Sequence, residues 1–147
     1  MCPTVTHSDD EILLRRAAAR ATGDWLYAHV WEFFASLSFR VPVSERDAGR
    51  LFEKVWIRRL DWHARRATAW ARITTGGDTS TRIHVHALID ARGHVSGDLL
   101  QSAWEFGNSR ILRYDRSKGA AFYIGRHLRD STALLTLSSC RWRPGSQ

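Results

Sequence analysis

The sequence predicts an α+β fold in which flanking helices pack on a four- to five-stranded antiparallel sheet. In several short stretches apolar residues alternate with polar ones, as they do in half-buried strands. Between these stretches apolar residues recur at helical spacing, and the order is helix, then β-α-β-β-α-β, then helix. This order is typical of ferredoxin-like sandwiches.

We expect the 147 residues to form a single domain over 1–147. Its core should span about 31–130, between an N-terminal helix over about 9–21 and a C-terminal tail over about 131–147. The net charge is +7, and nearly all basic residues are arginines, whose fork suits phosphates. A polyanionic partner is therefore favoured over a basic surface without a partner.

Two further properties bear on the cellular setting. No apolar run approaches the ~20 residues of a membrane span, and the polar, acidic N-terminal stretch does not resemble a signal peptide. Cys2 and Cys140 lie near opposite ends of the chain, which indicates reduced thiols rather than a disulfide framework. A cytoplasmic protein without membrane contact is the expectation.

The first half of the chain predicts a helix, a strand and a second helix. Ser8 and Glu11 form a capping-box pattern ahead of the helix over 9–21, which Gly23 should end. Alternation over 33–41 predicts a strand with one apolar face. A second capping pattern opens an amphipathic helix over 44–63. Its basic stripe should be a solvated face and comprises Arg46, Arg50, Lys54 and Arg58.

The second half predicts a hairpin, a helix, a strand and a last helix. The stretches 67–75 and 82–89 alternate and should pair across the turn at 76–80. A short helix over 96–107 should bury Leu99, Leu100, Ala103 and Trp104. A strand over 110–115 follows, and Ser117 can cap a helix over 118–130.

His84 and His86 lie one residue apart in the strand over 82–89. Residues at i and i+2 of a strand point to the same face, so two imidazoles can converge on one divalent ion there. The opposite face of this strand is already apolar without them, so they are not needed as core residues. The alternative is a pair of surface histidines.

Tyr123 is a candidate nucleophile on the last helix. The buried stripe of that helix should comprise Ala121, Ile124, Gly125 and Leu128. Tyr123, Arg126 and His127 fall on the other side. A phenol beside a guanidinium can attack a phosphodiester, because the cation stabilises both phenolate and phosphate. The alternative is a surface tyrosine, and Tyr27 and Tyr114 are weaker candidates.

Three stretches in order, "FFASLSFR", "RIHVHALI" and "GAAFYIGRHL", resemble the motifs of the HUH endonucleases. The similarity is greatest to rolling-circle replication initiator (Rep) proteins. In that family an apolar, Thr-rich strand precedes a His-x-His strand, and a helical Tyr-x-x-Lys follows, often with a second tyrosine. Here serine stands for threonine, Arg126 replaces the lysine and His127 the second tyrosine.

The resemblance implies a ferredoxin/RRM-like HUH fold and an enzyme that nicks and rejoins DNA at specific sites. His84 and His86 would hold Mg²⁺ or Mn²⁺, and Tyr123 would attack the phosphorus to leave a 5′-phosphotyrosine and a free 3′-OH. Arg126 would orient the phosphate. Single-stranded or hairpin origin DNA would be the substrate.

The chain departs from the family pattern at the third metal ligand. The family often supplies a glutamate from the strand before the histidines, where this chain has Thr74 and Thr75. Asp78 or His63 could substitute. An oxygen ligand is expected, because imidazoles alone suit softer metals better than Mg²⁺. The change from lysine to Arg126 is a second departure.

We expect Arg40, Trp70, Arg72 and Arg82 to contact DNA near the histidines, with phosphates on the arginines and a base on Trp70. Trp70 could instead pack under the last helix. Two other functions stay open. One is a single-strand insertion-sequence transposase, whose tyrosine helix usually carries a downstream glutamine that this chain lacks. The other is a catalytically degenerate, RRM-like nucleic-acid-binding domain.

Overall fold

The computed structural model describes residues 8–60, 66, 68–76, 82–129, 133–138 and 143–145. It contains a five-stranded antiparallel sheet in the order β4-β1-β3-β2-β5, which confirms the α+β prediction. The strands are β1 (Phe33–Ser38), β2 (Ala69–Thr75), β3 (His84–Asp90), β4 (Ser109–Arg113) and β5 (Leu134–Leu137). The helices are α1 (Asp9–Tyr27), α2 (Glu45–Arg50), α4 (Gly97–Ala103) and α5 (Ala120–Arg126).

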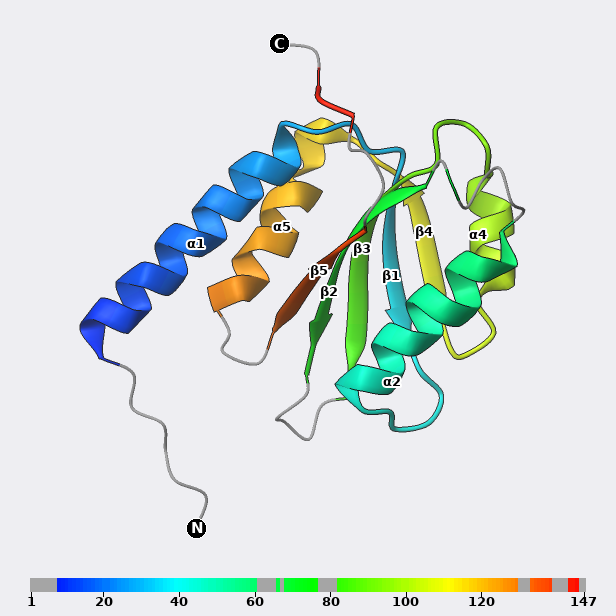
Figure 1. The fold of residues 1–147 in the computed structure, drawn as a ribbon, viewed down its shortest axis with the longest axis horizontal. Coiled ribbons are helices and arrows are strands. Elements are labelled where there is room, and N and C mark those ends of the chain that lie inside the picture. Colours follow the sequence, from blue (N-terminus) through cyan, green and yellow to red (C-terminus); the bar gives the residue numbers. More distant parts are fainter. Residues whose placement is uncertain are drawn as a thin grey trace.

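The helices cover the sheet from both sides. α1 and α5 lie on one face, and α2 and α4 lie on the other (Figure 1). A π-helical turn (Leu51–Trp56) and a 3₁₀ turn (Ile57–Arg59) continue α2, so the predicted amphipathic helix forms but changes its pitch. None of the helices among the described residues is long and apolar enough to cross a membrane.

Each face of the sheet has its own apolar core. On β3, Val85, Ala87 and Ile89 join the core under α2 and α4. Leu88, whose side chain points to the other face of the strand, joins the core under α1 and α5. His84 and His86 share the face of Leu88, because side chains alternate along a strand. The histidines therefore lie on the side that carries α1 and α5.

The predicted helix starts are confirmed at two sites. The Ser8 hydroxyl accepts a hydrogen bond from the Glu11 amide at 3.3 Å, and Ser44 accepts one from Asp47 at 3.1 Å. Ser117 does not cap the last helix, whose N-cap is Gly119, a residue without a capping side chain. Asp115 instead accepts the Ser117 amide at the start of a 3₁₀ turn over Arg116–Lys118. The basic stripe beside α2 is exposed, as predicted.

Gly23 does not end the first helix, which runs on to Tyr27. A Cβ at Gly23 would lie 2.8 Å from Cδ1 of Phe122, and one at Gly125 would lie 2.7 Å from the carbonyl oxygen of Ala19. α1 and α5 therefore approach backbone to backbone at these glycines. Gly23 is needed for this close packing and not for a helix end, which is why the prediction was wrong.

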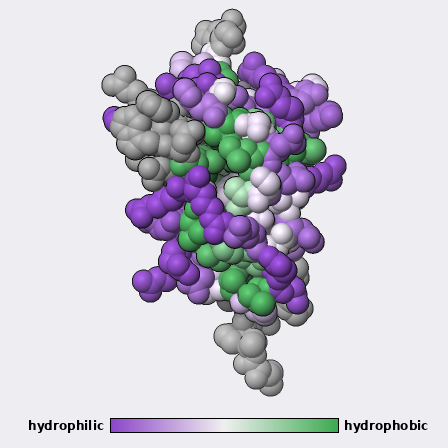
Figure 2. Space-filling view, turned by 90° about the vertical axis from the view of Figure 1, so that its right-hand side faces the viewer, coloured by the Kyte–Doolittle hydropathy of each residue, from purple (hydrophilic) through white to green (hydrophobic). Residues whose placement is uncertain are grey.

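Two burial predictions are also corrected. Val41 is 63% exposed, because β1 ends at Ser38 and the strand face does not extend to it. Leu99 of α4 is 50% exposed, whereas Leu100 and Trp104 are buried as predicted. The side of the molecule that carries α4 and β4, at the right of Figure 1, shows hydrophobic side chains among hydrophilic ones (Figure 2).

The C-terminal segment belongs to the fold, contrary to the prediction of a tail over 131–147. β5 pairs with β2 and completes the sheet. Further along, Arg143 Nε donates to Oδ2 of the fully buried Asp90 at 2.6 Å, and Pro144 forms a β-bridge with His29. Cys2 and Cys140 lie outside the described residues.

Candidate active site

The His84–His86 pair sits on β3, the middle strand of the sheet. Both imidazoles are half-buried. In the register of the sheet, Ser36 of β1 lies opposite His86, and its hydroxyl oxygen is 3.2 Å from His86 Nδ1. This hydrogen bond orients the ring and leaves Nε2 for another partner. The prediction that both histidines share one face is confirmed.

α5 brings Tyr123 to His86. The two ring centroids are 5.2 Å apart and the rings meet edge to face. His127, one turn further along, stacks on His86 at 5.4 Å and contacts the Tyr123 ring at 4.7 Å. We call His86, Tyr123 and His127 the histidine–tyrosine cluster. Tyr123 is 39% exposed, so its ring can be reached from solvent.

Phe34 of β1 supports this cluster. Its ring is 6.0 Å from His86 and 6.1 Å from Tyr123. Aromatic pairs at these separations favour defined ring orientations. Phe34 and Ser36, neighbours on one face of β1, therefore hold the His86 ring from two directions.

Burial, together with the smaller effects of the nearby His127 and His84, lowers the pKa of His86 to about 4. His86 is therefore neutral near pH 7. A neutral imidazole offers the lone pair that a metal ion needs.

This shift predicts a pH-dependent stability. In the unfolded chain His86 titrates near pH 6.5, whereas in the folded protein it stays unprotonated down to about pH 4. Between these values only the unfolded state binds the proton, so the free energy of unfolding falls as the pH drops from 6.5 to 4. The loss attributable to His86 should reach about 3 kcal/mol.

Urea unfolding at pH 7 and pH 4.5, compared between the wild type and His86→Gln, measures this contribution. The wild type should lose about 2 to 3 kcal/mol more than the variant over that interval. Equal losses in the two proteins would show that His86 is not held neutral by its surroundings.

Shallow pockets flank the cluster on both sides. One, of about 190 Å³, is lined by Ser36, Ser38, His84, His86, Asn108 and Arg110, among others. The other, of about 290 Å³, runs along Phe34 and Tyr123 and is lined by Lys118 and Asp115, among others. Arg110 beside the histidines and Lys118 beside Tyr123 are cations that can contact phosphate oxygens.

Of the four predicted DNA contacts, Arg40 and Arg82 lie where they were expected. Both line a pocket of about 280 Å³ that also includes His84. Arg82 Nη1 donates to the backbone oxygen of Arg40 at 3.0 Å, and Arg40 donates to the backbone of Glu105. Both side chains are exposed.

Trp70 and Arg72 do not lie near the histidines, and this part of the prediction is wrong. Both point to the opposite face of the sheet and are 7% and 5% exposed. Trp70 packs edge to face on Phe52 at 5.1 Å, not under the last helix. Arg72 forms an ion pair with Glu53 at 2.9 Å. In the sheet register Ile73, not Arg72, pairs with His86.

Arg126 lies away from the cluster's pockets. It lines a separate pocket between α1 and α5. Among the described residues no hydrogen bond or ion pair links Arg126 to Tyr123. Its predicted role at the scissile phosphate therefore stays a prediction.

The donor set for a divalent ion consists of two imidazoles on one face of β3, those of His84 and His86. Within the described part of the chain, no group of three His, Cys, Asp or Glu side chains is arranged to hold a metal. Thr74 is buried, and Thr75 pairs with His84 across the strands. Asp78 and His63, the predicted substitutes for the third ligand, lie outside the described residues.

No protein-family model, curated protein or solved structure matches the chain. His127 is the residue that sequence reasoning left without a role. Its spacing of four residues from Tyr123 was the signal that both side chains lie on one face of the helix.

Proposed function

We propose that this chain is a metal-dependent, single-stranded DNA endonuclease and strand transferase of the kind that initiates rolling-circle replication. The observation that carries the proposal is the approach of Tyr123 to His86. Two elements far apart in the sequence, β3 and α5, bring a candidate nucleophile and a candidate metal ligand to a ring separation of 5.2 Å. The resemblance to HUH endonucleases pairs these same two residue types.

In the proposed reaction the Tyr123 hydroxyl oxygen attacks the phosphorus of a phosphodiester. The bond from phosphorus to the 3′ oxygen breaks, and a bond from phosphorus to the tyrosine oxygen forms. The phenol loses its proton to solvent, and the released 3′ oxygen takes one up. The 5′ phosphate stays on Tyr123, and attack by a 3′-OH reverses the step and rejoins the strand.

Bound Mg²⁺ or Mn²⁺ would be held by His84 and His86 and would polarise the scissile phosphate. Ser36 keeps the His86 ring oriented through their contact at 3.2 Å. Arg40 and Arg82 supply positive charge beside His84, where the backbone of single-stranded or hairpin DNA would lie. We place the protein in the cytoplasm, where such DNA is replicated.

The test is an adduct assay with labelled single-stranded oligonucleotides and Mn²⁺, read on a denaturing gel. The wild type should form a covalent adduct that chelation of the metal prevents. Loss of an outer-shell partner typically lowers metal affinity about 10- to 100-fold. His86→Ala removes a proposed direct ligand, so it should lower Mn²⁺ affinity by more than that. Calorimetric titration of Mn²⁺ measures that affinity without DNA.

The same assay separates the alternatives. A protein that binds the oligonucleotides and never forms an adduct is a nucleic-acid-binding domain rather than a nuclease. Cleavage tied to hairpin ends indicates a transposase. His94→Ala is the matched control, because His94 is an exposed histidine beyond the end of β3. It should leave both the affinity and the adduct unchanged.

A further inference from the structure

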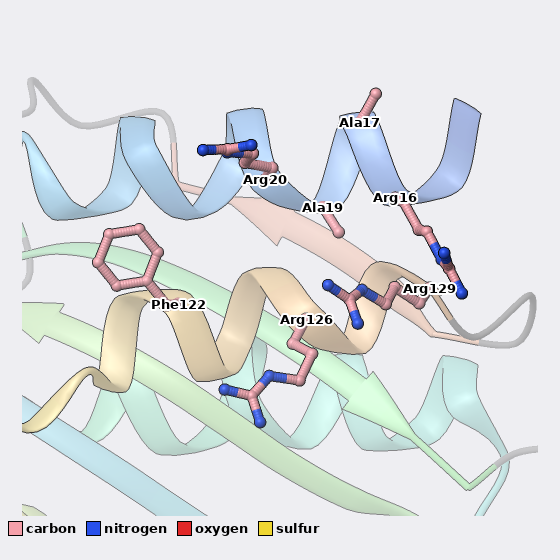
Figure 3. Close-up of a pocket in the computed structure, with 7 residues that line it drawn as sticks. All are labelled: Arg16, Ala17, Ala19, Arg20, Phe122, Arg126 and Arg129. Carbon is pink, nitrogen blue, oxygen red and sulfur yellow. The ribbon is translucent and has the colours of Figure 1, made fainter. Parts of the chain in front are cut away.

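A second basic site lies between α1 and α5. It is a pocket of about 560 Å³, and we call it the arginine groove. α1 contributes Arg16 and Arg20, the end of α5 contributes Arg126, and the 3₁₀ turn that follows it (His127–Arg129) contributes Arg129 (Figure 3). Phe122, one turn before Arg126, forms its apolar wall. None of its lining residues takes part in the pockets beside His84, His86 or Tyr123.

The four arginines of the groove carry no compensating charge within the described part of the chain. Among those residues none of the four has an ion pair or a side-chain hydrogen bond. The neighbouring Arg15 differs, because it pairs with Glu11 at 2.7 Å. Guanidinium groups that line one groove repel one another unless an anion lies between them.

The spacing of the arginines suits a chain of phosphates. Arg16 and Arg20 are four residues apart, which places them about 6 Å apart along the helix axis. Across the groove Arg129 lies toward α1, whereas the Arg126 side chain runs to the other side of α5 (Figure 3). A guanidinium binds phosphate oxygens in a bidentate manner, so Arg16 and Arg20 offer two consecutive phosphate sites and Arg129 offers a third.

Phe122 distinguishes a nucleic acid strand from a simple anion. Its ring is 38% exposed at the wall of the groove, where an unpaired base can stack on it. A lipid surface is disfavoured, because the first turn of α1 carries Asp9, Asp10 and Glu11, which would repel anionic headgroups. The charge and the aromatic ring together favour a flexible strand with exposed bases.

We propose that the arginine groove binds the backbone of single-stranded DNA, separately from the histidine–tyrosine cluster. This inference rests on the charge and shape of the groove and does not require that the chain cut DNA. If the chain does nick a DNA strand, the arginine groove would bind a second segment of that strand, away from the segment at the histidine–tyrosine cluster.

The test compares two triple variants that remove the same charge. The groove variant is Arg16→Gln, Arg20→Gln, Arg129→Gln. The control variant is Arg46→Gln, Lys54→Gln, Arg58→Gln, from the exposed stripe beside α2. Fluorescence anisotropy with a labelled 20-mer of thymidine should show about 30-fold weaker binding in the groove variant and less than about 3-fold in the control. The salt slope should fall by about 2 in the groove variant only.

Further measurements on the same variants complete the test. Circular dichroism must show the same thermal unfolding for both triple variants. Phe122→Leu should weaken thymidine 20-mer binding by about 5-fold or more and leave binding of inorganic polyphosphate unchanged. Equal losses of thymidine 20-mer binding in the two triple variants would overturn the proposal. It would also be overturned if the groove variant lost duplex DNA binding to the same extent as single-strand binding, or lost only binding to anionic phosphatidylserine vesicles. A change of oligomeric state in the groove variant alone would assign the groove to contact between copies.

Discussion

Tyr123→Phe should abolish the covalent DNA adduct, with a fall in its rate of at least about 1,000-fold. The substitution removes only the hydroxyl oxygen that attacks phosphorus. The remaining ring can keep its edge-to-face contacts with His86 at 5.2 Å and with Phe34 at 6.1 Å, so the site should stay folded. Labelled oligonucleotide incubated with Mn²⁺ and resolved on a denaturing gel measures the adduct.

The other two tyrosines provide the controls. Tyr27 lies under Arg116, whose guanidinium carbon is 4.0 Å from its ring centroid. Burial raises the pKa of the Tyr114 phenol, which makes it harder to deprotonate. Tyr27→Phe and Tyr114→Phe should therefore keep the adduct. An adduct that survives in Tyr123→Phe and disappears in either of these would assign the nucleophile elsewhere.

Glu53→Ala should destabilise the protein by about 3 kcal/mol or more. Arg72 is 5% exposed, and Glu53 is its ion-pair partner at 2.9 Å. Without that carboxylate a buried cation would remain beside the faces of Phe52 and Trp70, whose ring centroids are 5.4 and 5.5 Å from its guanidinium carbon. Burial lowers the pKa of Arg72, and the Glu53 charge opposes this shift. Urea unfolding at pH 7 measures the loss.

The double variant shows whether the cost comes from an unpaired charge. Arg72→Met should change the free energy of unfolding by less than about 1.5 kcal/mol, because an apolar side chain of similar length fills the same space. Glu53→Ala combined with Arg72→Met should recover most of the stability lost in Glu53→Ala. A double variant as unstable as Glu53→Ala would show that Glu53 acts through packing. DNA affinity should be unchanged in Arg72→Met.

The sequence predicted the elements that depend on local patterns. Ser8 and Ser44 cap helices as their spacing indicated, because capping uses residues within one turn. The alternation in β3 placed His84 and His86 on one face, since a strand of seven residues leaves no other choice. Tyr123 and His127 followed from helical spacing in the same way.

The failures concern contacts between distant segments. Alternation correctly separated Trp70 and Arg72 from Ala71 and Ile73, yet both faces of β2 are buried, so the pattern could not tell which one meets the histidines. The register with β3 decides this, and it pairs Ile73 with His86. An arginine on a strand also suggested a solvent-exposed side chain. In the structure Glu53, from the helical segment after α2, pairs with Arg72 and allows it to be buried.

The backbone contact between Gly23 and Gly125 makes two segments that are far apart in the sequence depend on each other for close packing. A Cβ at Gly125 would lie 2.8 Å from the Gly23 amide nitrogen, so neither position can gain a side chain unless the other helix shifts. Natural variants should therefore keep small residues at both positions or change them together. A fragment limited to 31–130 would therefore lack α1 and leave the packing face of the tyrosine helix α5 uncovered.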